Sequence, residues 1–202
     1  MAIKINLART ERILFCGSKW WGDPDLPENI QYPTVRVTDE EGESFDYPLT
    51  FICQINCEDI APYDKEGRLP HEGMLYFFGA IDRFIGYDSP TECVSGEWPK
   101  GHIVVKYAKS VNFETFQSCI LVDDDDRSLT EPELEISFSN CEDSEEGIRM
   151  LIGRDDSTVL LRLASDESAG TDFGRGHLDI ILKDSDLKFG NWKRAKAVLE
   201  EI

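Results

Sequence analysis

Aromatic residues gather in one proline-rich segment near the start of the chain. Trp20, Trp21 and Tyr32 lie among three prolines, at positions 24, 27 and 33. Tryptophan and tyrosine side chains can stack on a sugar ring or anchor a protein interface, where both are enriched. The alternative is that they cover the hydrophobic core. We therefore take Trp20, Trp21 and Tyr32 as candidate binding residues.

The densest acidic cluster is a run of four aspartates: Asp123, Asp124, Asp125 and Asp126. Calcium loops space their oxygen ligands at alternate positions around a sharp glycine turn, and this run has neither feature. The spacing therefore disfavours calcium. Contact with a basic protein and a plain solvated loop are the other interpretations, and we keep the four aspartates as candidate binding residues.

The sequence contains no recognisable catalytic, metal or cofactor motif. His71, His102 and His177 are scattered, without the spacing of zinc ligands. The Gly-Arg-Gly at 174–176 leads into an expected strand, whereas a phosphate-binding loop leads into a helix, so a turn is the better interpretation. There is no Gly-x-Ser-x-Gly elbow. We predict no cofactor, no metal and no catalytic residue, and we favour a non-enzymatic role over an unsuspected hydrolase.

Acidic residues outnumber basic ones, 40 against 21, for a formal net charge of −19. Nucleic acids and anionic membrane surfaces are bound through clustered lysine and arginine, so neither is an expected partner. A basic protein would be attracted over about one Debye length, ~8 Å at physiological salt. The alternative is that the surplus carboxylates serve solubility alone.

The chain has the features of a cytoplasmic protein. Its first ten residues lack an apolar stretch of signal-peptide length, and eighteen apolar residues nowhere run together. Six cysteines are spread along the chain without a Cys-x-x-Cys pair. That distribution does not suit a small disulfide scaffold, so we expect reduced thiols.

Short segments of alternating apolar and polar residues predict strands along most of the chain. We expect about eight to ten, the clearest at 49–57, 73–78, 102–108, 133–138, 148–152, 159–163 and 177–183. Single helical turns are predicted at 58–60 and 184–187. The tail, 191–202, has helix-favouring composition.

Two strand-loop-strand segments resemble each other, which suggests a duplication. Residues 52–55 and 73–78 echo residues 160–163 and 176–181. Chance similarity between such units is common and is the alternative. A true repeat would make the single domain, 1–202, two antiparallel β lobes at about 14–110 and 111–202 that share one core. A groove between the lobes would then be the first place to seek a ligand.

Three segments in a fixed order carry a resemblance to a known family: Lys19-Trp-Trp-Gly-Asp-Pro-Asp-Leu-Pro27, Pro48-Leu-Thr-Phe-Ile-Cys-Gln-Ile-Asn-Cys-Glu-Asp-Ile60 and Leu69-Pro-His-Glu-Gly-Met-Leu-Tyr-Phe-Phe78. The chain resembles the YwqG-like family, with further agreement at 151–153, 160–167, 176–178 and 186–187. It departs from many relatives at 173–176, where they carry Trp-Gly-Asp-x-Gly. The chain is also too short to hold the helical segment that many relatives have before the first of these motifs.

The resemblance implies an α+β, predominantly β domain with an internal duplication, few short helices and a final strand over 192–199. It supplies no established activity and no catalytic residue. Some relatives are encoded beside secreted toxins, which implies an immunity protein by association. Our first hypothesis is an interaction protein that presents an acidic surface to a basic protein. The alternative is a small-ligand or glycan-binding module that uses the inter-lobe groove and the aromatic segment.

Overall fold

The computed structural model describes residues 1–123 and 125–201. Its strands are β1 (Ala2–Ala8), β2 (Lys19–Trp20), β3 (Asp25–Pro27), β4 (Thr34–Thr38), β5 (Ser44–Pro48), β6 (Thr50–Asn56), β7 (Met74–Gly79), β8 (Gly96–Glu97), β9 (Ile103–Ala108), β10 (Phe116–Ser118), β11 (Leu134–Cys141), β12 (Arg149–Met150), β13 (Ile152–Arg154), β14 (Ser157–Ala164), β15 (His177–Lys183) and β16 (Lys196–Glu200). The helical segments are α1 (Cys57–Ile60), α2 (Asp184–Lys188) and the 3-10 turns η1 (Asp82–Ile85) and η2 (Trp192–Arg194).

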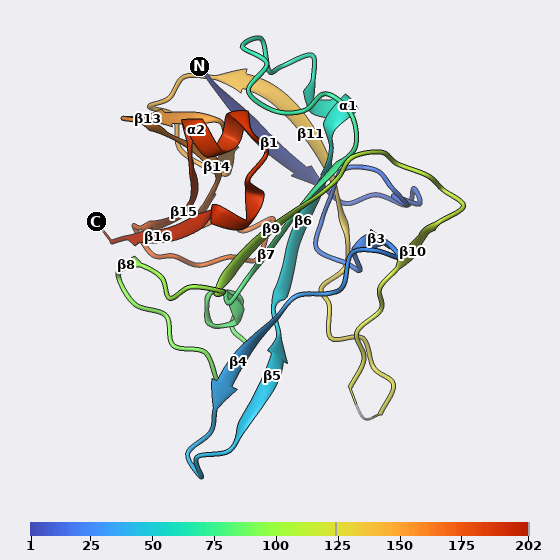
Figure 1. The fold of residues 1–202 in the computed structure, drawn as a ribbon, viewed down its shortest axis with the longest axis vertical. Helices are drawn as coiled ribbons and strands as arrows, with labels where there is room; N and C mark the ends of the chain where they lie inside the picture. The colour runs from blue at the N-terminus through green and yellow to red at the C-terminus, as the bar shows by residue number, and fades with distance from the viewer. Residues whose placement is uncertain (124, 202) are drawn as a thin grey trace.

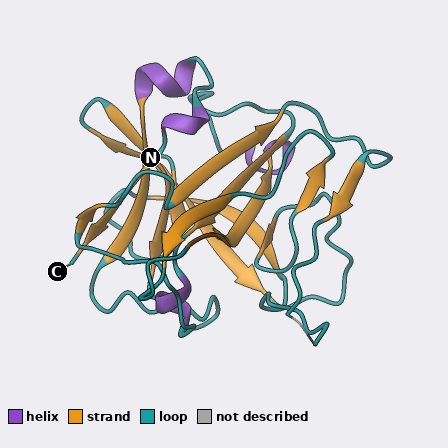
Figure 2. Ribbon diagram, turned by 60° about the horizontal axis from the view of Figure 1, so that its bottom comes forward, coloured by secondary structure: helices purple, strands orange, loops and turns teal. Residues whose placement is uncertain are grey.

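Twelve of the strands form one curled antiparallel sheet (Figures 1 and 2). Their order is β8-β16-β15-β14-β12-β1-β11-β2-β6-β7-β9, with β13 paired to β14. Two small ribbons, β3 with β10 and β4 with β5, lie outside this sheet. The prediction of a predominantly β fold with few short helices is confirmed.

The predicted strands are present, except that the one expected at 148–152 is divided at Leu151 (φ 59°) into β12 and β13, and they are fewer than the sixteen that the described residues form. Several of the additional strands are only two or three residues long, too short to show a period of two. The longest one missed is β1, whose Ala-Ile-Lys-Ile-Asn-Leu-Ala sequence does alternate. In the tail, η2 leads into strand β16, so the expected final strand is confirmed over the helix that propensity favours.

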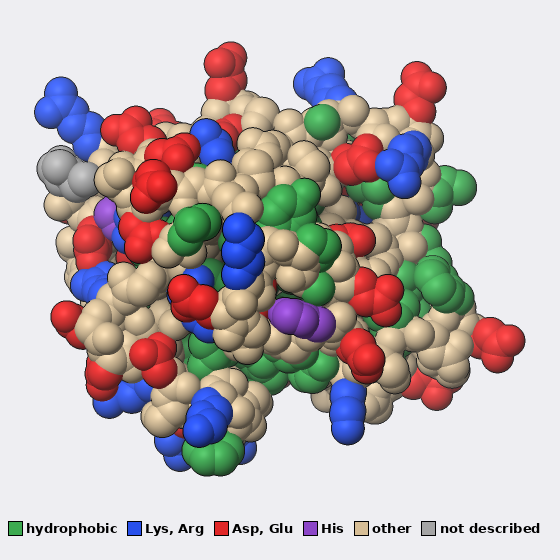
Figure 3. Space-filling model, turned by 90° about the horizontal axis from the view of Figure 1, so that it is seen from above, with side chains coloured by type: hydrophobic (Ala, Val, Ile, Leu, Met, Phe, Trp, Pro, Cys, Tyr) green, Lys and Arg blue, Asp and Glu red, His purple; other side chains and the backbone are tan. Residues whose placement is uncertain are grey.

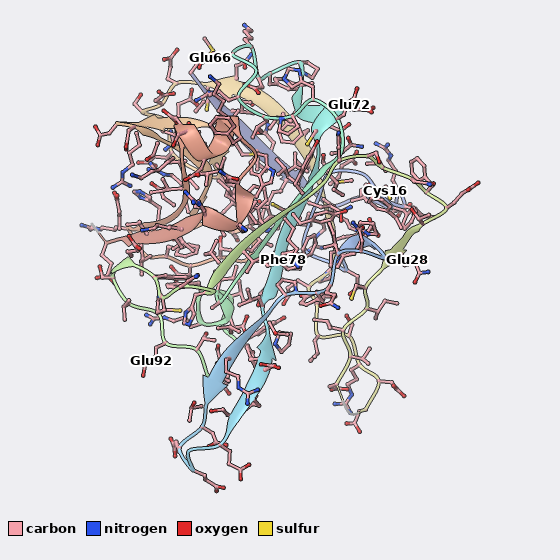
Figure 4. All side chains as sticks on the ribbon, in the orientation of Figure 1. Cys16, Glu28, Glu66, Glu72, Phe78 and Glu92 are labelled. Atoms are coloured by element: carbon pink, nitrogen blue, oxygen red, sulfur yellow. The ribbon has the colours of Figure 1, made fainter. Side chains whose placement is uncertain are left out.

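One hydrophobic core receives side chains from both ends of the chain, from Ile3 to Leu199. Strand β7 is buried along its whole length, and its Phe78 lies at the middle of the molecule (Figure 4). Strand β11 instead buries Leu134, Ile136 and Phe138 while intervening residues are more exposed. These are the two burial patterns that the sequence predicts for a central and a half-exposed strand.

A buried carboxylate joins the start of the chain to the sheet. Asp25 is fully buried and accepts hydrogen bonds from Gln54 Nε2 (2.7 Å), Ser118 Oγ (2.7 Å) and the Cys16 amide (2.8 Å). Lys19 Nζ lies 3.0 Å from the same carboxylate. Because hydrogen bonds and a counter-ion compensate its charge, this network fixes the aromatic segment on the sheet.

None of the helices in residues 1–123 and 125–201 is long and apolar enough to cross a lipid bilayer. At the end of the molecule that carries α1 and α2, lysine and arginine side chains lie among acidic ones (Figure 3). The opposite end, at the bottom of Figure 1, carries the β4–β5 hairpin and the loop that contains Asp123, Asp125 and Asp126.

Candidate functional site

The aromatic segment and the acidic loop meet at one pocket of about 470 Å³. We call it the Asp82 pocket. Its walls carry aromatic rings, hydroxyls and carboxylates, and its lining residues are Trp21, Gly22, Tyr32, Tyr47, Pro48, Leu49, Thr50, Phe51, Asp82, Ile85, Tyr87, Asp88, Leu121, Ser128, Leu129, Thr130 and Glu131. No lysine, arginine, histidine or cysteine is among these described lining residues.

Four separate segments build the pocket. Trp21 follows β2 with a positive φ of 57°, which turns the chain out of the sheet while its amide donates to the Ile52 carbonyl (3.0 Å). The end of β5 and the start of β6 supply residues 47–51, and η1 with its C-cap region supplies residues 82–88. The fourth wall is the acidic loop (residues 121–131), whose stem is closed by a bridge between Val122 and Ser128.

Asp82 is the central charged group of the pocket. It is 5% exposed, and it accepts hydrogen bonds from the hydroxyls of Tyr47 and Thr50. At the rim, the Tyr87 hydroxyl donates to Glu131. Burial, reinforced by these carboxylates, raises the pKa of Tyr47 and raises that of Tyr87 to about 12. Both tyrosines therefore remain protonated donors at neutral pH and cannot serve there as bases.

The structure brings Trp21 and Tyr32 to the pocket but not Trp20. The Trp20 side chain is fully buried in the core, so no ligand can touch it. Trp21 is 4% exposed, and its indole N–H donates to the Ala169 carbonyl (2.8 Å). The Tyr32 hydroxyl donates to the Leu49 carbonyl (2.7 Å). The polar atoms of both rings are thus used internally, and only their carbon surfaces are available to a ligand.

The described aspartates of the acidic loop differ in role: one holds the turn, and the others are exposed at the surface. Asp123 Oδ1 accepts the amides of Asp125 and Arg127, each at 2.9 Å, and so holds the turn. Asp125 and Asp126 are exposed, and Asp125 forms a surface ion pair with Arg127. Asp124 lies outside the described residues. The part of the loop available to a partner is therefore its tip.

A second acidic projection stands beside the pocket and was not expected from the sequence. The β4–β5 hairpin extends from the same end as the acidic loop in Figure 1, and Figure 4 shows oxygen-bearing side chains at its tip. Residues 34–48 and residues 121–131 each contain five acidic residues and one arginine. Both segments also supply pocket residues at their bases.

Tyr47, Asp82 and Tyr87 are among the pocket residues that the sequence analysis did not identify. The one available signal was Asp82, an acid placed just beyond the buried strand β7. Tyr47 lies next to the motif that begins at Pro48 and carried no signal of its own. Residues this far apart along the chain meet only because β6 and β7 pair in the sheet.

A second polar cluster lies on β15 and β16. His177, Asp179 and Glu200 place potential metal ligands within 4.8 Å of one another. However, Arg162 binds both oxygens of the fully buried Asp179 (2.6 and 2.7 Å), and Arg154 lies 2.6 Å from Glu200. A divalent cation would have to share these carboxylates with two guanidinium groups. The arrangement therefore favours an ion-pair network over a metal centre.

Fold and site together define an antiparallel β-sheet protein with an acidic, aromatic-walled pocket. The chain belongs to the family described as a domain of unknown function, DUF1963, which matches residues 18–151. Every residue that lines the Asp82 pocket falls inside the matched region, whereas the ion-pair network of β15 and β16 lies outside it. No curated protein matches the sequence.

Proposed function

We propose that this protein is a non-enzymatic binding protein whose partner is a basic protein. The observation that carries the proposal is the convergence of two acidic projections on one pocket. The β4–β5 hairpin and the acidic loop project from the same end of the molecule, and their bases share the walls of the Asp82 pocket (Figure 1). A basic surface docking at this end would meet negative charge on both projections and between them.

The chemistry of the pocket supports binding over catalysis. Its lining offers hydroxyls and carboxylates, but no histidine, lysine or cysteine among the described residues. A hydroxyl nucleophile needs an adjacent base to accept its proton. The hydroxyls of Tyr47 and Tyr87 do donate to carboxylates, but their raised pKa values keep the protons on the tyrosine oxygens and make both groups poor nucleophiles at neutral pH.

The test is affinity capture from the native cell followed by measurement of the complex. We expect a basic partner whose affinity falls on the order of tenfold or more when salt rises from low to physiological concentration. Neutralising the loop tip (Asp125→Asn with Asp126→Asn) should weaken binding mainly through slower association. The matched control is Glu145→Gln with Glu146→Gln, in the turn after β11, which removes the same charge elsewhere. Salt-independent binding, or equal loss in both pairs, would contradict the proposal.

Three further points belong to this proposal. The YwqG-like resemblance implies one form of this function, an immunity protein that neutralises a basic toxin. We also propose that the chain belongs to the YwqG-like group within the broader family. A cytoplasmic location is also proposed. All six cysteines are free, as expected of a protein from a reducing compartment.

The second candidate is a small-ligand or glycan-binding module. It is favoured by the rings of Tyr32, Tyr47 and Tyr87 around a pocket that also offers the hydroxyls of Ser128 and Thr130. A thermal-shift screen of neutral sugars would test it. A sugar that stabilises the wild type but not Tyr87→Ala would support this function, and no response from any sugar would count against it.

We also propose that the sheet arose by an internal duplication. The first strand of each half, β1 or β11, pairs with the next strand of the other half, β12 or β2. Outward from the central β1–β11 pair, the order is β12, β14, β15, β16 on one side and β2, β6, β7, β9 on the other, with the two-residue β8 added beyond β16. In this scheme the first half is β1, β2, β6, β7 and β9. The lobe limits expected from the sequence, about 14–110 and 111–202, leave out β1. This strand pairs with β11 and β12, which are both strands of the other half.

Local irregularities support the duplication. The ladder register shifts after Phe51 in β6 and after Val159 in β14. Gly73 and Gly176 immediately precede β7 and β15, and a Cβ on either would lie 2.2 or 2.3 Å from the last carbonyl oxygen of β9 or β16. Gly73→Ala and Gly176→Ala should therefore both destabilise the fold. Full tolerance of one of them would argue against equivalent halves.

A further inference from the structure

The buried aspartates of the described residues differ in one respect. Three of the five have a lysine or arginine side chain nearby: Asp25 has Lys19 (3.0 Å), Asp179 has Arg162 (2.6 Å) and Asp186 has Arg194 (3.1 Å). Asp64 lies 3.5 Å from His71, which is a cation only when it is protonated. Asp82 is the fifth, and no lysine, arginine or histidine nitrogen of residues 1–123 and 125–201 forms an ion pair with it. It is also the one of the five that lines the Asp82 pocket.

The neighbours of Asp82 compensate its charge only in part. The hydroxyls of Tyr47 and Thr50 donate to it, and it begins the short turn η1. Hydroxyl dipoles carry no net charge, and a turn of four residues adds little. Buried charges in proteins are normally paired, because an isolated one loses its hydration without replacement. The missing counter-ion would have to come from outside the chain.

The other half of the sheet provides an internal comparison. Thr158 Oγ1 donates to Asp184 Oδ1 (2.8 Å) between β14 and α2, as Thr50 donates to Asp82 between β6 and η1. The cavity around Asp184, however, is lined by three cationic side chains, Arg68, Arg154 and Lys188, together with the carboxylates of Glu66 and Asp155. Asp184 itself is exposed. The hydroxyl–carboxylate pair at Asp184 thus has cationic side chains in its cavity, whereas the corresponding pair at Asp82 has none among the described lining residues of its pocket.

We propose that the Asp82 pocket binds the ammonium or guanidinium group of an alkyl cation, which pairs with Asp82 while its carbon chain packs on the aromatic walls. Such a group is attracted both by the carboxylates and by the faces of tyrosine rings. The inference rests on the proposed function, in which the cation is a lysine or arginine side chain of the basic partner. A free small amine would present the same chemistry.

The test compares ligands that differ in charge alone. N-acetyl-L-arginine amide and N-acetyl-L-citrulline amide have nearly the same shape, but only the first is a cation. Calorimetric titration of the wild type at low salt should detect the arginine compound and give at least about tenfold weaker binding for citrulline, as expected when a charge-assisted hydrogen bond is lost. This comparison needs no variant and so does not depend on one that folds.

Two variants locate the effect. Asp82→Asn should lower the affinity for N-acetyl-L-arginine amide by about tenfold to a hundredfold. Asp184→Asn, at the corresponding position of the other half, should leave this affinity unchanged. Agmatine and spermidine distinguish the source of the cation. Binding of these free amines together with failure of the arginine amide would assign the pocket to a small amine.

The inference is overturned if no cation binds the wild type, if citrulline binds as well as arginine, or if Asp82→Asn and Asp184→Asn have equal effects. Failure of this inference and failure of the proposed function are separable. If the acidic-loop variant loses the basic partner but no cation enters the pocket, the docking face stands and the pocket assignment falls. If cations bind the pocket but no basic partner is captured, the pocket assignment stands and the proposed docking face falls.

Discussion

Asp25 and Asp82 are buried to a similar degree, but substitution by asparagine should destabilise the protein only at Asp25. Asp25→Asn removes the nearest counter-ion of the buried Lys19, and breaking a buried pair in this way costs about 3–5 kcal/mol. Glu133 remains 3.4 Å from Lys19 Nζ and is 35% exposed on its side chain, so we expect a loss near the lower end, about 3 kcal/mol. Asp82→Asn removes a charge that has no cationic partner in the described chain. Its free energy of unfolding should be unchanged or higher.

The assay is urea unfolding followed by tryptophan fluorescence, with thermal melts as a second readout. For a chain of 202 residues, a loss of about 3 kcal/mol corresponds to a fall in Tm of about 6–12 °C. Asp25→Asn should show this fall, and Asp82→Asn should not. Equal losses in the two variants would refute the reasoning, because they would mean that Asp82 is compensated as fully as Asp25.

Three further predictions follow from burial and charge. Trp20→Ala should cost about 3–5 kcal/mol in chemical denaturation, because the ring is fully buried. Tyr87→Ala, at 42% exposed, should cost less, about 0.5–1.5 kcal/mol, because it removes one surface hydrogen bond, and equal costs would contradict the assignment of core and pocket. Burial raises the pKa of Cys16 to about 11 and that of Cys57 to about 12, so mass spectrometry should find both unmodified by iodoacetamide at pH 7.5 until the protein unfolds. Burial also lowers the pKa of His177 below its ordinary 6.5, so the unfolded state binds the proton more readily than the folded state, and stability is lost as pH falls through and below 6.5. His177→Gln should therefore flatten the acid side of a curve of unfolding free energy against pH. An unchanged slope would contradict this prediction.

Much of the sheet was predictable because its strands carry their burial pattern in their own residues. β15 has the bounds expected from the sequence, and β11 shows the expected alternation of Leu134, Ile136 and Phe138. The short strands could not be predicted in general, because Lys19–Trp20 and Gly96–Glu97 are defined only by the strands beside them. Local pattern therefore predicted the long elements, and tertiary pairing decided the short ones.

The candidate site was only partly predictable for the same reason. Trp21 and Tyr32 were found by residue type, but so was Trp20, which the structure places in the core. Trp20 ends β2, whereas Trp21 lies beyond it with a positive φ, and residue type alone does not say which of the two tryptophans faces the pocket. Asp82 was missed because its lack of a counter-ion is a property of its surroundings, which form only when β5, β6 and η1 come together.

The most direct measurement is a crystal structure of the protein with N-acetyl-L-arginine amide. A guanidinium nitrogen within about 3 Å of an Asp82 carboxylate oxygen, with the side chain against the tyrosine rings, is the result that our account predicts. The compound bound elsewhere, or in the pocket with its guanidinium directed away from Asp82, would contradict it.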